Sequence, residues 1–207
     1  MYKRQIYGLP EHSAEKIKEA NLVAVPGCYP TASILGLLPV IPYLQQNSKI
    51  ILDAKSGISG AGKSSVENGL EEDIKENFKS YNVGFHRHQP EIKDFLKTEF
   101  NLDHEIIFIP HLLPLFRGEY VTLYCEVSQN DLDLNELYES YYEKHKLVRV
   151  KEKGEIAEIK EVINTFYCDI SVSYAFQSNT IIVNSAIDNL LKGAASQAIQ
   201  CLDIMSS

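Results

Sequence analysis

The sequence predicts an α+β fold in which a largely antiparallel or mixed sheet is flanked by helices. Three features support this prediction. The second half of the chain contains several short β-branched and aromatic segments, often alternating with polar residues, as in strands with one covered face. Segments whose apolar residues recur with helical spacing lie between and after these strand-like segments. The 207 residues, 44% of them hydrophobic, are enough to bury a core without disulfides.

The elements are expected in the following order. The apolar run 21–25 predicts a short buried strand, and a helix is expected from near Pro30 until Pro39 limits it. Residues 48–57 predict a second strand, and the glycines after it predict a loop over 57–65. Beyond the loop, helical spacing covers 71–82, 90–99 (with Pro90 in its first turn) and 134–145, strand patterns cover 105–110, 119–127, 147–152, 164–176 and 179–186, and a last helix begins near Asp188.

Charge and composition exclude several classes of function. Lys and Arg number 20 against 28 Asp and Glu, and no basic stripe indicates nucleic acid or anionic lipid. No apolar run approaches the roughly 20 residues of a membrane-spanning helix and no secretory signal is recognisable, so a cytoplasmic location is expected. The cysteines have neither CxxC nor zinc-type spacing, which predicts free thiols and no metal site at Cys28, Cys125, Cys168 and Cys201.

Cys28, in the stretch VPGCYPT, is the strongest candidate for a reactive group. It follows the Pro26-Gly27 turn and precedes the helix expected near Pro30, where free backbone N–H groups and the helix dipole lower a thiol pKa. Gly27 also lets the chain turn sharply and a substrate approach. The alternative, a small buried hydrophobe, suits the three cysteines that lie inside strand or helix patterns. Cys28 is therefore predicted to be a nucleophile.

A dense polar cluster, GFHRHQPEI, places His86, Arg87, His88 and Glu91 just ahead of a helix. A cysteine that attacks an acyl group needs a nearby base and acid, and histidine titrates in the suitable range. Strand-like alternation would direct both histidines to one side and Arg87 to the other. The alternative is a solvated loop that caps the helix.

Two further segments offer binding groups. PHLLPLFRGEY contributes His111 and Arg117, whose planar guanidinium suits a carboxylate or phosphate. SGISGAGK has neither P-loop nor GxGxxG spacing, and it is either a simple turn or a place where the backbone approaches a ligand. In DNLLKGAASQAIQ, Gly193 and its neighbours would allow close approach by another backbone or a ligand ring. The residues singled out in the glycine loop and at the start of the last helix are Ser56, Gly57, Ser59, Gly60, Gly62, Lys63 and Asn189.

Five motifs taken together, in this order, resemble one family: VPGCYPT, SGISGAGK, HRHQPEI, PHLLPLFRG and DNLLKGAASQAIQ. The chain resembles the N-acetyl-gamma-glutamyl-phosphate reductases, which are related to aspartate-semialdehyde dehydrogenase, from residue 7 onward. The family often has Asn where this sequence has Val25. The resemblance implies a fold like the C-terminal catalytic domain of glyceraldehyde-3-phosphate and aspartate-semialdehyde dehydrogenases.

The resemblance also implies a reaction. The Cys28 thiolate would attack the acyl phosphate of N-acetyl-glutamyl phosphate, phosphate would leave, and NADPH would reduce the thioester to the semialdehyde. One histidine would be the acid/base, with His88 favoured over His86. The residues implied to bind or orient substrate are Arg87, Glu91, His111 and Arg117, and those implied to face the NADP cofactor are Ser56, Gly57, Ser59, Gly60, Gly62 and Asn189. A homodimer or homotetramer is expected.

Members of that family carry an N-terminal dinucleotide-binding domain, and this chain has no glycine-rich turn of that kind near its start. Residues 1–207 are therefore predicted to be the catalytic and dimerisation portion. The alternatives are an inactive dimerising fragment, a related reductase that acts on aspartyl or N-acetyl-aminoadipyl phosphate, and a cofactor-free cysteine hydrolase. The hydrolase would leave the glycine loop unexplained.

Overall fold

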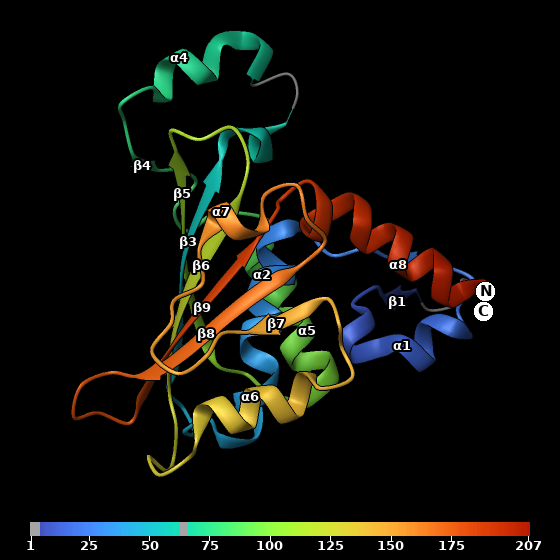
Figure 1. Ribbon diagram of the computed structural model, residues 1–207, viewed down its shortest axis with the longest axis vertical. Coiled ribbons are helices and arrows are strands. Elements are labelled where there is room, and N and C mark those ends of the chain that lie inside the picture. The colour runs from blue at the N-terminus through green and yellow to red at the C-terminus, as the bar shows by residue number, and fades with distance from the viewer. Residues whose placement is uncertain (1–4, 63–65) are drawn as a thin grey trace.

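The computed structural model describes residues 5–62 and 66–207, and its centre is a seven-stranded mixed sheet (Figure 1). The strand order is β4-β5-β3-β6-β9-β8-β7, in which β3–β5 and β7–β8 are parallel and the other neighbours antiparallel. The predicted α+β fold with a mixed sheet is thus confirmed. The strands are β3 (Lys49–Gly57), β4 (Lys79–Ser80), β5 (Glu105–Leu113), β6 (Glu119–Glu126), β7 (Val148–Val150), β8 (Cys168–Tyr174) and β9 (Thr180–Ile187).

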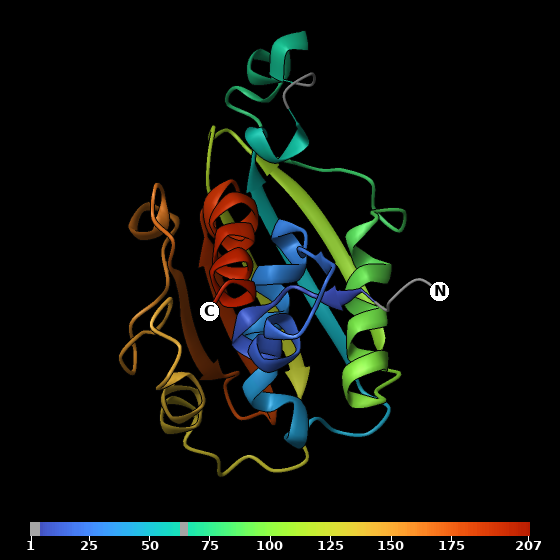
Figure 2. The ribbon, with the colours of Figure 1, turned by 90° about the vertical axis from the view of Figure 1, so that its right-hand side faces the viewer.

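Helices cover one face of this sheet. In Figure 2, α2 lies between α5 and α8 in front of the strands, and α1 lies outside α2 and α8. The helices are α1 (Pro10–Lys18), α2 (Cys28–Leu37), α4 (Glu71–Ile74), α5 (His88–Phe100), α6 (Leu134–Tyr142), α7 (Ile159–Val162) and α8 (Ser196–Met205). The 3-10 segments are η1 (Leu38–Tyr43) and η2 (Ile58–Ala61), and the π-helical turns are η3 (Val66–Leu70) and η4 (Leu191–Ala195). No helix among the described residues is long and apolar enough to span a membrane.

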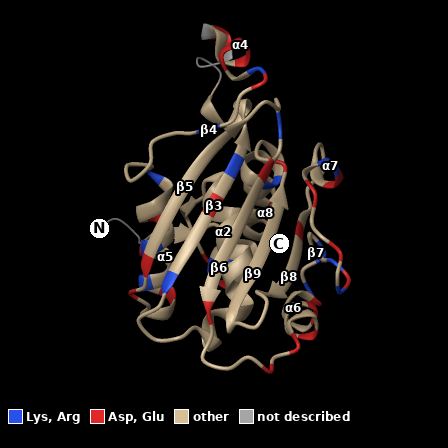
Figure 3. Cartoon of the chain, turned by 90° about the vertical axis from the view of Figure 1, so that its left-hand side faces the viewer, with Lys and Arg blue, Asp and Glu red and all other residues tan. Residues whose placement is uncertain are grey.

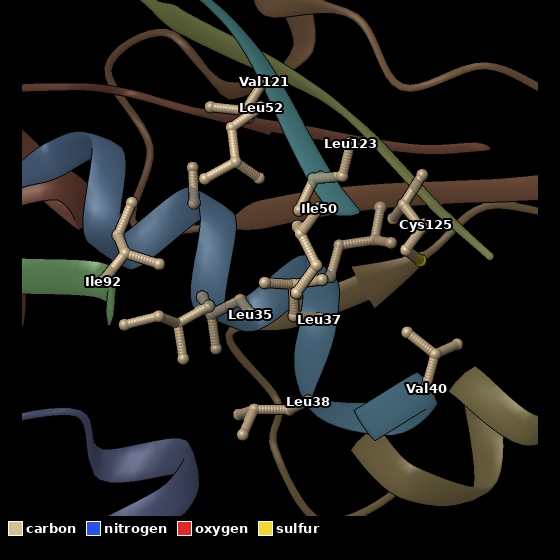
Figure 4. Packing of buried hydrophobic residues seen from close by; sticks show 14 of the residues in the cluster. Leu35, Leu37, Leu38, Val40, Ile50, Leu52, Ile92, Val121, Leu123 and Cys125 are labelled. Carbon is tan, nitrogen blue, oxygen red and sulfur yellow. The ribbon is translucent and has the colours of Figure 1, made fainter. Parts of the chain in front are cut away.

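The hydrophobic core lies between α2 and the covered face of the sheet (Figure 4). Leu35 and Leu37 of α2 pack in the same cluster as Leu52 and Leu123 of the central strands, and all four are fully buried. Every residue of α2 after Cys28 is buried, so the helix has no solvent-facing side. The core therefore fixes α2, and with it the position of Cys28, against the middle of the sheet.

The opposite face of the sheet is free of helices over β5 and β3 (Figure 3), whereas the short helix α7 packs on that face near β9, where Val162 clusters with Ala186. In β3 the buried residues alternate with Asp53 and Lys55, which are only partly buried and form an ion pair of 2.7 Å between Nζ and Oδ2. In β5, His111 belongs to the same half-exposed set. This open face carries polar side chains beside partly buried apolar ones.

A small unit precedes α2. β1 (Ile6–Tyr7) and β2 (Val23–Ala24) form a separate two-stranded parallel sheet, connected by α1. A parallel pair joined by a helix is a βαβ unit. Residues 6–24 therefore belong to a different layer from the seven-stranded sheet.

The helix expected near Pro30 is present and begins two residues earlier, at Cys28, because Gly27 serves as its N-cap residue. Two other predicted boundaries are wrong. The helix expected over 71–82 is the single turn α4, since Glu76 adopts a left-handed φ of 56° and the chain then enters β4. The strand expected from residue 164 begins at Cys168, because Asn164 also has a left-handed φ, of 61°.

Candidate active site

Cys28 is the first residue of α2, directly after a tightly held turn. The Gly27 carbonyl accepts hydrogen bonds from the backbone N and from the Oγ1 of Thr31, at 3.0 and 2.9 Å. The Gly27 backbone N donates to Oε1 of Glu91 on α5, at 3.1 Å, and the same oxygen accepts from the Tyr7 hydroxyl at 2.9 Å. Three segments distant in sequence therefore fix the turn that presents the thiol.

His88 lies against this turn. It is the first residue of α5 and is buried, and a Cβ on Gly27 would lie 2.3 Å from its Nε2. The glycine is required here because the imidazole occupies the space of a side chain. The predicted proximity of Cys28 and the histidine motif is thus a direct packing of His88 on the residue before Cys28.

His86 lies next to His88, with ring centroids 4.8 Å apart, and its Nδ1 accepts a hydrogen bond from the His88 backbone N at 3.2 Å. The predicted juxtaposition of the two rings is present, but its predicted cause, strand-like alternation, is wrong. His88 belongs to a helix and His86 to the turn before it. Tyr29, the second residue of α2, presents its ring edge-on to both imidazoles.

Burial lowers the pKa of both histidines. For His88, burial and the neighbouring His86 and Arg87 lower the pKa to about 3. The pKa of His86 is also lowered, by partial burial and by Arg87. His88 is therefore a neutral imidazole at physiological pH. Its Nδ1 is buried and makes no hydrogen bond within the described part of the chain.

The thiol pKa of Cys28 is raised well above its ordinary value, which corrects the expectation of a lowered one. Burial is the largest cause, and the charge and hydrogen-bonding contact of Glu119 add to it. The backbone N–H groups of Tyr29 and Cys28 act in the predicted direction, but they are outweighed. In its resting form Cys28 is a protonated thiol.

Gly193, in the last of the five motifs, also lies against Cys28. A Cβ on Gly193, in η4, would lie 2.7 Å from the Cβ of Cys28 and 3.2 Å from Cδ1 of Ile187. The close approach predicted at Gly193 is therefore made to the Cα and Cβ of Cys28.

The glycine loop and Asn189 also come together. Asn189 donates from Nδ2 to the Ser59 hydroxyl at 3.0 Å, and its Oδ1 accepts from the Gly118 backbone N at 2.8 Å. A Cβ on Gly60 would lie 2.8 Å from the Ser56 hydroxyl. Gly62 has a φ of 92° and open space around it among the described atoms. The loop is thus packed on one side and exposed on the other; Lys63 lies outside the described residues.

Gly57 has a different role from the rest of the loop. It is buried, and a Cβ there would lie 2.8 Å from the Phe116 carbonyl and from the Arg117 backbone N. The loop before β6 packs directly on it. The absence of a side chain at Gly57 is therefore explained by internal packing.

The candidate substrate-binding residues have different positions. Arg87 is exposed at the N-terminus of α5, and Glu91 is committed to the Gly27 turn. Arg117 donates from one terminal nitrogen to the buried Asp188 carboxylate at 3.2 Å. The structure does not bring the His111 side chain into this cluster: it lies on the open sheet face, with Nδ1 3.3 Å from Oδ1 of Asp53.

Sequence reasoning missed three side chains of the cluster, Tyr29, Tyr81 and Glu119. The Tyr81 hydroxyl donates to that of Tyr29 at 3.4 Å and lies 3.5 Å from Nε2 of His86. Glu119 begins β6 and is fully buried. One signal was available, since a carboxylate at an inward position of an apolar strand is unusual. The described residues contain no group of three His, Cys, Asp or Glu side chains placed to hold a metal ion.

The fold is that of the aspartate-semialdehyde dehydrogenases. Aspartate semialdehyde dehydrogenase II from Vibrio cholerae superimposes on 98% of the chain with a TM-score of 0.77, at 16% identity and over 68% of its own chain. The Candida albicans enzyme, solved with NADP, has a TM-score of 0.72 over 99% of this chain and 68% of its own, at 12% identity. At such identities the likeness concerns the fold alone.

The chain belongs to the semialdehyde dehydrogenase family, since residues 28–189 match the family model described as "Semialdehyde dehydrogenase, dimerisation domain". It is 43% identical over 98% of its length to N-acetyl-gamma-glutamyl-phosphate reductase of Thermoanaerobacter sp. (strain X514), and 43% identical over 99% to that of Halothermothrix orenii. The chain spans 59% and 60% of those two proteins. The predicted resemblance is thereby confirmed.

Proposed function

We propose that this chain provides the catalytic centre of an NADP-dependent reductase that converts N-acetyl-glutamyl 5-phosphate into N-acetyl-glutamate 5-semialdehyde and phosphate. The observation that carries the proposal is Cys28 at the start of α2 with His88 packed on Gly27. The names of the relatives at 43% identity support the substrate. This reaction is a step of arginine biosynthesis.

The Cys28 sulfur forms the bond to the acyl carbon, and the C–O bond to phosphate breaks with its electron pair leaving on the phosphate. His88 and His86 are the acid/base groups for the acyl oxygen, with His88 preferred because it packs on the turn before the thiol. A neutral imidazole donates one hydrogen bond from its ring N–H, which suits an oxygen that gains negative charge. Arg87 and Arg117 are the cations proposed for the anionic ends of the substrate.

The exposed rim of the glycine loop fits the nicotinamide side of NADP. Ser59, Gly60 and Gly62 would hold it, because the space beside Gly62 is open among the described atoms, and the buried Asn189 would position Ser59 through its hydrogen bond. When bound, the cofactor supplies the hydride that reduces the acyl group. The sequence expectation included Ser56 and Gly57 in this set; both are buried, so they support the loop from behind.

We further propose that a dinucleotide-binding domain belongs in front of this catalytic and dimerisation portion in the whole enzyme. The parallel β1–α1–β2 unit and the longer relatives support this arrangement. The open face of the seven-stranded sheet is proposed to bind a second copy of the chain, which the family description supports. Light scattering on the purified chain tests the dimer.

The reaction is tested on this chain by its first half, which needs no reductant. The chain is mixed with N-acetyl-glutamyl phosphate and with aspartyl phosphate, and intact-mass spectrometry measures the thioester. An N-acetyl-glutamyl adduct on the native chain and none on Cys28→Ser is expected. Equal labelling of both proteins would exclude Cys28 as nucleophile. Preferential labelling by aspartyl phosphate would show that the substrate is aspartyl phosphate and not N-acetyl-glutamyl phosphate.

The reduction is tested separately. NADPH added to the acylated chain, together with a purified dinucleotide-binding domain of a relative, is expected to release the semialdehyde. A cofactor-free hydrolase would instead lose the adduct to water without NADPH. Calorimetric titration with NADPH measures how much affinity the chain has on its own.

A further inference from the structure

Glu119 is a fully buried carboxyl group at the covered face of the sheet. It is the first residue of β6, and its register neighbours are Ser56 on β3 and Ile187 on β9, neither of which is charged. Neither carboxyl oxygen makes a well-formed hydrogen bond to any residue that the structure describes. Burying a carboxyl group without hydrogen bonds costs folding free energy. The presence of Glu119 at this position therefore needs a reason other than stability.

The Cys28 thiol lies beside this carboxyl, although their geometry falls short of a well-formed hydrogen bond. The packing brings the two elements together: Gly193 touches both the Cβ of Cys28 and the side chain of Ile187, the register neighbour of Glu119. The start of α2 therefore lies over the start of β6. The carboxyl of Glu119 therefore lies in the same layer of packing as the Cys28 thiol.

We propose that Glu119 is a catalytic residue that accepts the thiol proton of Cys28 when the thiol attacks an acyl group. The inference rests on the proposed function and adds the base that activates its nucleophile. In this step the S–H bond breaks and the proton passes to a carboxylate oxygen of Glu119. The sulfur electron pair forms the C–S bond, and the C–O electron pair departs with the phosphate. When the C–S bond breaks after reduction, Glu119 returns the proton to the sulfur.

Glu119 is better suited to this proton transfer than the neighbouring histidine. Burial raises the carboxyl pKa of Glu119 to about 8, whereas the pKa of His88 is about 3. The group whose pKa lies near the working pH combines a useful population of the basic form with a useful basicity. His88 then has the separate role of donating a hydrogen bond to the acyl oxygen.

The other titratable groups around the pair leave this assignment intact. Tyr29 on α2 and Tyr81 before α5 sense the charge of both Cys28 and Glu119, and the pKa of each is raised, so both stay neutral. On the side of η4, Lys192 is buried but paired with Glu11, at 2.6 Å. The guanidinium of Arg117, two residues before β6, is paired with Asp188.

The test is the pH profile of Cys28 alkylation by iodoacetamide, followed by intact-mass spectrometry on the purified chain. Cys28→Ser gives the background, which is expected to be small because Cys125, Cys168 and Cys201 are each at most 2% exposed. The variants are Glu119→Gln, which keeps the shape and removes the base, and Glu119→Asp, which keeps a carboxyl. Glu126→Gln, at the exposed end of the same strand, is the matched control. Thermal melting confirms that each variant is folded.

A base role predicts that Glu119→Gln lowers the alkylation rate between pH 7 and 9 by at least about tenfold, while Glu119→Asp keeps part of the rate and Glu126→Gln all of it. If Glu119 only repelled the thiolate, its removal would lower the thiol pKa and Glu119→Gln would react faster. A faster or unchanged rate therefore overturns the proposal. Alkylation does not use the substrate, so the acylation experiment can fail on its own and thereby refute the proposed substrate.

Discussion

The substitution Glu91→Ala provides a quantitative test of how the turn before Cys28 is held. Oε1 of Glu91 accepts hydrogen bonds from the Tyr7 hydroxyl at 2.9 Å and from the Gly27 backbone N at 3.1 Å. Hydrogen bonds to a charged acceptor contribute roughly 1.5–3 kcal/mol each. Since Glu91 is only partly buried, the lower end applies, and the loss is about 3 kcal/mol for the two bonds.

A destabilisation of this size lowers the melting temperature by roughly 6–12 °C for a chain of about 200 residues. Differential scanning calorimetry measures it, with Asp94→Ala as the control, because Asp94 is an exposed acidic residue on the same helix. Tyr7→Phe removes one of the two bonds and is expected to cost about half as much. If Glu91→Ala melts within a degree or two of Asp94→Ala, the carboxylate does not hold the turn and the reasoning fails.

Three other substitutions test the packing of the site. Gly27→Ala would place a Cβ 2.3 Å from Nε2 of His88, so the imidazole must move; urea unfolding should show a loss of about 1–3 kcal/mol. Lys192→Met breaks a fully buried ion pair and should cost about 3–5 kcal/mol in the same assay, whereas Lys192→Met combined with Glu11→Leu should recover most of it. Glu119 binds its proton more tightly in the folded state, because burial raises its pKa from 4.5 to about 8, so the stability of the native chain should fall as the pH rises between these values. Glu119→Gln should remove that fall, whose limit is roughly 5 kcal/mol, and unfolding at pH 5 and pH 8.5 measures it.

The fold was largely accessible from sequence periodicity, and the exceptions have local causes. Alternation along β5, β6 and β9 marks the covered face because each strand has one apolar side against a helix, α5 for β5 and α2 for β6 and β9. The 71–82 segment has helical spacing, but a spacing pattern does not show that the backbone reverses at Glu76. The strand predicted over 21–25 is present as β2, although it is only partly buried, whereas β1 and α1 were missed; β1 is two residues long, too short for any periodic signal.

The site was predictable where one motif determines its own geometry. Pro26-Gly27 followed by Cys28 implied a turn and a helix start, and the structure contains both. The cluster around the thiol is assembled by long-range packing, which no local pattern encodes. The family resemblance implied that His111 binds substrate, but strand alternation turns its side chain to the far face of the sheet. Glu119 was overlooked although a carboxylate in an apolar strand gave a signal, because the packing that brings it to Cys28 is long-range.

The resting charge of the site follows from its burial. Cys28 is a thiol with a raised pKa, His88 is a neutral imidazole and Glu119 has a pKa of about 8, so at pH 7 all three are mainly uncharged. A thiol held in this state reacts poorly with oxidants and adventitious electrophiles, since the thiolate is the nucleophile. In the proposed reaction, attack depends on a proton transfer inside the site rather than on a standing thiolate at the helix start. The helix N-terminus would stabilise the charge that appears on sulfur as that proton leaves, so the helix dipole and the buried carboxyl would act on the same sulfur atom one after the other.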